Sequence, residues 1–183
     1  MGALCLFGGQ MIDITALVHA QAHVDDNVTI GARSRIWQFA SVIRGAQIGA
    51  GCNVASCAII DGARLGDRCA VGHGVSIPPG IWIGDEVFIG PGVVFCNDVW
   101  PSVSKDGFDM ASFLAGDVTI RVDRGANIGA GAIILPGVVI GAGSTVAAGC
   151  VVRDNVIPNH VLRRDGRLTP PDGSERPRMR IVL

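Results

Sequence analysis

The chain has 183 residues, 49% of them hydrophobic, and a formal net charge of −1 at pH 7. This length is sufficient for one domain with a real core, and the near-neutral charge gives no sign of a nucleic-acid partner. No stretch approaches the roughly 20 apolar residues of a membrane-spanning helix, so a membrane is not expected as a partner either.

Residues 1–17 form an N-terminal segment that precedes any repeat. Its first residues, Met1–Phe7, are apolar but too few for the hydrophobic region of a signal peptide, and they lack a basic flank. Leu6 stands where an N-myristoylation motif has Ser or Thr. These features favour a cytoplasmic protein.

Bulky apolar residues recur every six positions, with a one-residue deletion after Ile60 and an interruption after Phe95. Six is a multiple of two, so in β-strands the recurring apolar residues all lie on the same, inward side. Six is not a multiple of 3.6, so in an α-helix the same residues would be spread around the whole surface. The twenty positions are Val18, Val24, Ile30, Ile36, Val42, Ile48, Val54, Ile60, Leu65, Val71, Ile77, Ile83, Ile89, Phe95, Val122, Ile128, Ile134, Ile140, Val146 and Val152.

A second set of small or β-branched residues lies four positions after the bulky ones, from Ala22 to Val156. Three hexapeptides make one triangular coil of about 18 residues, and coils stack on one another. The repeats therefore predict an all-β, parallel solenoid of about seven triangular coils over residues 18–157.

Glycines and cysteines fit the same pattern. Glycine recurs just after the bulky residue, near a corner that needs either a positive φ or a close backbone approach; these are Gly31, Gly49, Gly66, Gly84, Gly90, Gly129 and Gly141. Cys52, Cys69 and Cys150 lie on the small inward track and are interpreted as buried apolar residues. No cysteine spacing suggests zinc or a disulfide framework.

Residues 97–121 break the repeat and predict one long protruding loop. A loop of this length in a solenoid is unusual unless it is functional, although a tolerated surface insertion is the alternative. Its aromatic and sulfur side chains predict packing on a neighbouring subunit or a ligand; they are Trp100, Phe108, Met110 and Phe113. Residues 158–183 lose the repeat and are expected to form an irregular tail, whose last residues, 180–183, are a candidate edge strand.

The repeat over residues 18–157 resembles that of the hexapeptide-repeat, left-handed β-helix acyltransferases. The left-handed winding is implied by this resemblance alone, since parallel crossovers are normally right-handed. Three segments resemble more narrowly the N-acetyltransferases of nucleotide-linked 3-amino sugars. They are Ser34-Arg-Ile-Trp-Gln-Phe39, Val87-Phe-Ile-Gly-Pro-Gly-Val-Val-Phe-Cys-Asn-Asp98 and Arg124-Gly-Ala-Asn-Ile-Gly-Ala.

The resemblance implies a homotrimer that moves an acetyl or related acyl group from acetyl-coenzyme A to the amine of a nucleotide-linked amino sugar, in polysaccharide building. It implies no metal. Coenzyme A would lie along a groove between two subunits, against Ala130 and Ala148, with Arg124 and Arg153 facing its phosphates. For the two arginines, the alternative is a solvated charge.

The acceptor side is expected at the start of the loop. Asn97 and Asp98 would face the sugar or position its amine, the alternative being a turn-forming role at the strand end. Trp37 would flank the nucleotide or, equally, pack against a subunit.

His73 is the candidate catalytic base. It lies two residues after an inward position, so its ring should point outward at a face or corner. An imidazole is available in its neutral form near neutral pH and suits removal of a proton from an attacking amine. Some relatives carry a histidine where this chain has Cys57, which leaves the base open between His73 and no protein base. The relatives' C-terminal Gly-x-Pro-Ala-Lys is replaced by residues 161–167.

Three alternatives stay open. An O-acetyltransferase of a sugar would use the same fold. A γ-class carbonic anhydrase needs three zinc-binding histidines with a close pair at mid-helix, which His19, His23, His73 and His160 do not provide. A non-catalytic solenoid is the third, because fold alone does not establish function.

Overall fold

The computed structural model describes residues 4–7, 10–101, 103 and 118–170. The regular elements in this part are 24 β-strands. Within these residues there is no helix whose length and apolar character would let it cross a membrane.

The strands form three sheets, here called A, B and C, which the chain visits in turn. Sheet A contains β1 (Leu4–Phe7), β2 (Gln10–Asp13), β5 (Thr29–Ile30), β8 (Gln47–Ile48), β11 (Arg64–Leu65), β14 (Ile81–Ile83), β17 (Ile120–Val122) and β20 (Val139–Ile140). Sheet B contains β3 (Leu17–Val18), β6 (Arg35–Ile36), β9 (Asn53–Val54), β12 (Ala70–Val71), β15 (Phe88–Ile89), β18 (Asn127–Ile128), β21 (Thr145–Val146), β23 (Val161–Leu162) and β24 (Leu168–Thr169). Sheet C contains β4 (His23–Val24), β7 (Ser41–Ile43), β10 (Ile59–Asp61), β13 (Ser76–Ile77), β16 (Val94–Phe95), β19 (Ile133–Ile134) and β22 (Val151–Val152).

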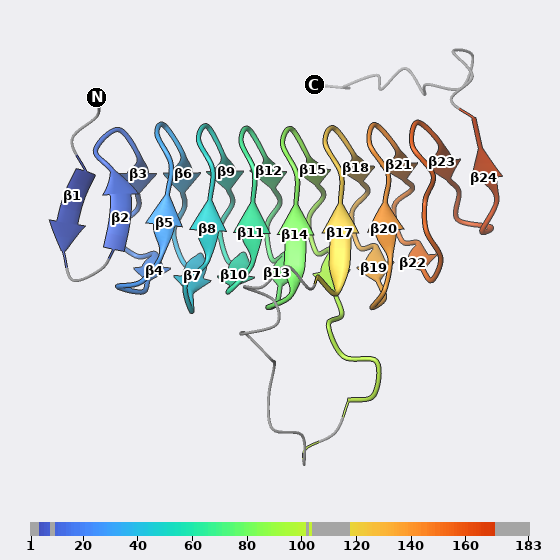
Figure 1. Ribbon diagram of the computed structural model, residues 1–183, viewed down its shortest axis with the longest axis horizontal. Coiled ribbons are helices and arrows are strands. Elements are labelled where there is room, and N and C mark those ends of the chain that lie inside the picture. The colour runs from blue at the N-terminus through green and yellow to red at the C-terminus, as the bar shows by residue number, and fades with distance from the viewer. Residues whose placement is uncertain (1–3, 8–9, 102, 104–117, 171–183) are drawn as a thin grey trace.

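The chain winds as a left-handed parallel β-helix. In Figure 1 the strands of sheet A from β2 to β20 run upward at the front, and the chain then turns over the top and descends at the back while it advances from left to right. Sheet B has eight parallel strands from β3 to β23, which are separated by seven turns of the chain. The fold class and the number of coils predicted from the period are thus confirmed.

The two predicted apolar tracks form the core. Equivalent residues of successive coils pair in register, as Ile60 does with Val42 and Ile77. All twenty bulky positions are buried except Val18 and Val24, which lie near the N-terminal end and pack partly buried against the core. A strand period of two therefore explains both the fold and the burial of the side chains.

The glycines that follow the bulky residues are needed for close approach rather than for a positive φ. A Cβ at Gly31 would lie 2.6 Å from the backbone N of Ala50, and one at Gly90 would lie 2.5 Å from that of Ala130. Such distances exclude any side chain, so these positions fix how closely coils stack at the corners.

The small inward track also holds polar and sulfur side chains. The buried hydroxyl of Ser34 donates to the carbonyl of Gly49 at 2.7 Å, which satisfies it inside the core. Cys52, Cys69 and Cys150 are 1%, 1% and 4% exposed, so their interpretation as buried apolar residues is confirmed.

Antiparallel hairpins lie at both ends of the solenoid. β1 pairs with β2 before the first coil, and β23 pairs with β24 after the last. The second hairpin lies inside residues 158–183, so the expectation of an irregular tail is wrong for this part; short hairpin strands carry no sixfold period that the sequence would reveal. Residues 180–183 are outside the described part.

The interruption is slightly shorter than predicted. Ile120 and Arg121 belong to β17 and pair with β14, because the strand begins before its bulky residue Val122. Trp100, at the start of the interruption, is 86% exposed. Phe108, Met110 and Phe113 lie outside the described residues.

Candidate functional site

The triangular cross-section has three corners, named AB, BC and CA after the sheets they join. The predicted site residues lie on all three corners, and one copy of the chain does not bring them together. Corner BC carries Trp37, His73, Ala130 and Ala148; corner CA carries Asn97, Asp98 and Arg153; and corner AB carries Arg124.

Corner BC is an open line of small residues with His73 on it. The N–H of Gly92 donates to the carbonyl of His73 at 2.8 Å, and equivalent bonds link Gly131 to Pro91 and Gly149 to Ala130. His73, Pro91, Ala130 and Ala148 therefore occupy equivalent places in four successive coils. At about 4.8 Å per coil, this line from His73 to Ala148 is about 14 Å long.

His73 is exposed at this corner. It stands between Gly72 and Gly74, and a Cβ added at Gly74 would meet no atom within 4 Å. The equivalent residues of the neighbouring coils are Ser56 and Pro91, neither of which is charged. The imidazole is thus open to a ligand or to a neighbouring copy of the chain.

Trp37 has a partner within the chain. Its indole Nε1 donates to the side-chain oxygen of Asn53 at 2.9 Å, and the residue is 36% exposed. It lies on the same corner as His73, two coils nearer the N-terminus, at a separation along the axis of about 10 Å. This bond fixes the orientation of the ring, and contact with a nucleotide stays a prediction.

Corner CA holds a cleft of about 600 Å³ that joins three of the predicted residues. Its lining comprises Cys96, Asn97, Asp98, Val99, Pro101, Leu135, Pro136 and Arg153. Most of this lining is apolar, whereas Asp98 and Arg153 supply opposite charges. Such a cleft suits a ligand that has a cationic group, an anionic group and an apolar portion.

The sequence reasoning did not find Cys96, Leu135 or Pro136. Cys96 and Leu135 each follow the bulky residue of a sheet C strand, as Arg153 does, and backbone bonds join Cys96 to Ile134 and Leu135 to Val152. Aligning the coils before and after the interruption by these equivalent positions would have predicted that Cys96, Leu135 and Arg153 lie side by side.

Asn97 is tied to the preceding coil. Its side-chain nitrogen donates to the carbonyl of Pro79 at 3.0 Å. This bond holds the start of the interruption against the solenoid and gives Asn97 a turn-stabilising role, and it leaves the amide oxygen as the group that would meet a ligand.

Arg124 is engaged in an ion-pair cluster on corner AB. Its guanidinium donates twice to Glu86 at 3.0 Å, and Glu86 also accepts from Arg68 at 2.9 Å. Hydrogen bonds from Arg68, and then from Arg124, lower the pKa of the Glu86 carboxyl. Sheet B separates this cluster from the line of His73, whereas Arg153 forms no ion pair with a described residue and borders the cleft.

Metal ligands are not grouped in the described part. Among these residues no three His, Cys, Asp or Glu side chains lie close enough to hold a metal ion.

Comparisons with known proteins agree with the fold. The pattern of the family described as "Bacterial transferase hexapeptide (six repeats)" matches residues 62–97 and 114–154. Bifunctional protein GlmU of Nitrosospira multiformis is 31% identical over 123 residues, which make up 67% of this chain and 24% of that protein. The chain thus spans about a quarter of the length of that relative.

Two solved structures share the architecture at low sequence identity. UDP-N-acetylglucosamine acyltransferase from Campylobacter jejuni is similar with a TM-score of 0.57 and 15% identity, over 82% of this chain and 70% of that one. The enzyme of the same name from Francisella novicida is similar with a TM-score of 0.51 and 17% identity, over 87% and 69%. At these identities the likeness concerns the fold.

Proposed function

We propose that the chain, whose residues 62–97 and 114–154 match the pattern of the bacterial hexapeptide transferases, moves an acetyl or related acyl group from acyl-coenzyme A to the amine of a nucleotide-linked amino sugar. The observation that carries the proposal is the exposed His73 at one end of the open line of small residues on corner BC. Two structures that share the fold are named as acyltransferases of UDP-N-acetylglucosamine, which supports a nucleotide-linked sugar as the acceptor, and the free amine is the further step proposed here. A role in polysaccharide building and a cytoplasmic location are parts of the same proposal.

The donor is proposed to lie along corner BC. Coenzyme A has an extended arm with amide groups, and the line from His73 past Ala130 to Ala148 offers backbone groups without obstructing side chains. The thioester would then lie at the His73 end. In this arrangement Arg153, or Arg124 of another copy, is proposed to face the phosphates.

Transfer is proposed to be direct. The amine nitrogen attacks the thioester carbonyl carbon, His73 accepts the amine proton, the carbon–sulfur bond breaks, and the sulfur leaves as the thiol after taking the proton from the imidazolium. Base catalysis of this kind contributes about 10²- to 10⁴-fold to the rate. No metal takes part in this scheme.

The acceptor is proposed to occupy the cleft on corner CA. Asp98 would attract the amino group, and Asn97 would hold the sugar through its amide oxygen. Val99, Leu135 and Pro136 would contact the apolar faces of the ligand.

Corners BC and CA of one copy lie on opposite edges of sheet C, so we infer that the complete site forms between copies of a homotrimer. The outer face of sheet C has an apolar column, Ile59, Val94, Ile133 and Val151, with exposures of 38–43%. These residues lie on neighbouring strands of the sheet, with Ser76 of β13 between Ile59 and Val94. If this face contacts the next copy around a threefold axis, corner BC of one chain lies against corner CA of the other.

The test is an activity screen. Acetyl-coenzyme A is incubated with a panel of nucleotide-linked sugars in matched pairs, each with an amine or a hydroxyl at the same carbon, and free thiol and acylated product are quantified. The proposal expects thiol release only with the amino sugars. Transfer to the hydroxyl partners alone would establish the O-acetyltransferase instead, and no transfer to any pair would contradict the proposed activity.

A further inference from the structure

A second pocket lies on the outer face of sheet A, away from corners BC and CA. It encloses about 290 Å³, and its lining includes Gln47, Arg64, Trp82 and Asp85. The proposed acyl transfer uses none of these four residues.

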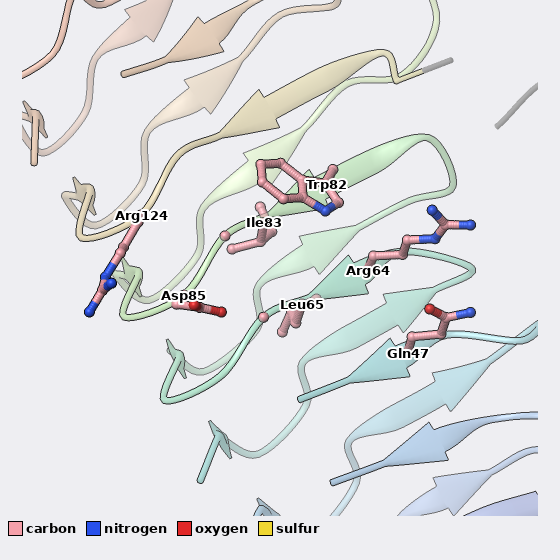
Figure 2. Close-up of a pocket in the computed structure, with 9 residues that line it drawn as sticks. Gln47, Arg64, Leu65, Trp82, Ile83, Asp85 and Arg124 are labelled. Atoms are coloured by element: carbon pink, nitrogen blue, oxygen red, sulfur yellow. The ribbon is translucent and has the colours of Figure 1, made fainter. Parts of the chain in front are cut away.

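Three of the lining side chains stand in one row across neighbouring strands. Gln47 of β8 pairs with Arg64 of β11, and Arg64 pairs with Trp82 of β14. Their side chains therefore project from the same face at a spacing of about 4.8 Å. Figure 2 shows Gln47 and Arg64 reaching toward the same side, with the indole of Trp82 above them.

The floor of the pocket is backbone. Leu65 and Ile83 turn their side chains into the core, where they are 4% and 0% exposed. At the corner end, a Cβ on Gly66 would lie 2.8 Å from the backbone N of Asp85, so no side chain fits there. Asp85 therefore closes the pocket at corner AB, and the free volume lies over the backbone of Leu65 and Ile83.

The charges at the two ends of the pocket differ. Arg64 provides a guanidinium at one end, whereas Asp85 lies at the corner end and accepts a hydrogen bond from the N–H of Asp67 through Oδ1 at 2.8 Å. Arg124 also lines the pocket at this corner end, where its guanidinium is paired with Glu86. An anion is therefore favoured beside Arg64, and a hydroxyl donor beside Oδ2 of Asp85.

We propose that this pocket binds a nucleoside monophosphate. Arg64 and the Gln47 amide hold the phosphate, because a planar guanidinium matches phosphate geometry. The base stacks on the indole of Trp82, an interaction that tolerates any base. Asp85 accepts a hydrogen bond from a ribose hydroxyl. None of these four residues takes part in the acyl transfer proposed above, although Arg124, a proposed donor contact, also lines the pocket.

The test is calorimetric titration of the full chain with uridine monophosphate, uridine, ribose 5-phosphate and inorganic phosphate. Uridine monophosphate should bind most tightly, and the loss of either the base or the phosphate should weaken binding by about tenfold or more. Arg64→Gln and Trp82→Leu should each weaken uridine monophosphate binding by about tenfold. Arg35→Gln and Phe88→Leu, matched changes on the outer face of sheet B, should leave it unchanged.

Three results would overturn this assignment. The first is inorganic phosphate binding as tightly as the nucleotide, and the second is a loss of binding from the sheet B changes as large as that from the sheet A changes. If Arg153→Gln abolishes nucleotide binding while Arg64→Gln does not, the nucleotide lies in the cleft on corner CA, and the proposed acyl transfer is unaffected. If binding depends on Arg64 and Trp82 in a chain that transfers no acyl group, the pocket assignment holds by itself.

Discussion

At the scale of single residues, the chemistry proposed for this chain depends on side chains that the fold leaves open. His73 lies between two glycines on an exposed corner, and Arg153 borders a cleft on another. Arg124, by contrast, is already paired with Glu86. The two arginines therefore differ in their capacity to bind a phosphate, a difference that their positions in the repeat do not predict.

Replacing His73 with Ala should lower kcat/KM for acyl transfer by about 10²- to 10⁴-fold, because the base that accepts the amine proton is lost. His160→Ala is the control, since His160 lies just before β23, away from corners BC and CA, and its Nδ1 lies 2.9 Å from the carbonyl oxygen of Pro158. Steady-state rates of the two variants provide the comparison. Full activity of His73→Ala would show that no base acts at this position.

Glu86 makes stability depend on pH in a predictable direction. Hydrogen bonds from Arg68 and Arg124 lower the pKa of its carboxyl, so its contribution is present above the ordinary carboxyl pKa and is lost as the pH falls through the lowered value. Glu86→Gln should therefore reduce stability toward urea at pH 7 and have no effect at a pH low enough to protonate the carboxyl. An equal loss at both values would mean that the cluster acts through packing rather than charge.

At the scale of the strand, the inward residue is expected to contribute more to the free energy of unfolding than its outward neighbour. Ile89 is fully buried in β15, whereas its neighbour Phe88 points outward and is 47% exposed. Ile89→Ala should destabilise the chain by about 2–5 kcal/mol through lost burial and an internal cavity. Phe88→Ala, although it removes a larger side chain, should have a much smaller effect. Urea denaturation of both variants tests the assigned register, and the reverse order of the two effects is incompatible with it.

Most of the coil architecture was predictable because each coil repeats the same constraint. Ile60 and Ile77, in equivalent places of successive coils, are both inward, and a period of six leaves no other choice for a strand. The winding sense was not contained in this period and came from resemblance. The hairpin of β23 and β24 was missed because two-residue strands outside the repeat leave no periodic signal.

The candidate site was less predictable than the coils. His73 was found because its distance from an inward residue determines that it points outward. The cleft that joins Arg153 to Leu135 depends on stacking across the interruption, which a linear reading of the repeat does not provide. Gln47, Arg64 and Trp82 carry no motif and become neighbours only through the register of sheet A.

At the scale of the whole molecule, the account depends on how copies of the chain meet. A triangular solenoid is convex at each corner, so corner BC alone cannot enclose a thioester. The apolar column on sheet C, which includes Ile133 and Val151, lies between the two corners that carry the proposed donor and acceptor sites. A trimer that covers this column would bury apolar surface and would also bring corner BC of one copy against corner CA of the next.

A charged side chain in the apolar column of sheet C should therefore dissociate the trimer. Ile133→Asp places a carboxylate in the proposed contact, where burial without a partner is costly. Sedimentation should show a trimer for the unmodified chain and a folded monomer without acyl transfer for the variant. Leu17→Asp, on the outer face of sheet B, is the control and should remain trimeric. A trimeric, active Ile133→Asp variant would place the contact elsewhere.

The most direct test of the shared site is a mixing experiment. His73→Ala and Arg153→Gln chains, each of low activity alone, are refolded together in equal amounts. If each site takes His73 from one copy and Arg153 from the next, random assembly restores about a quarter of the wild-type activity. If both residues act within one chain, the mixture is no more active than the average of the two variants, and this result would contradict the account.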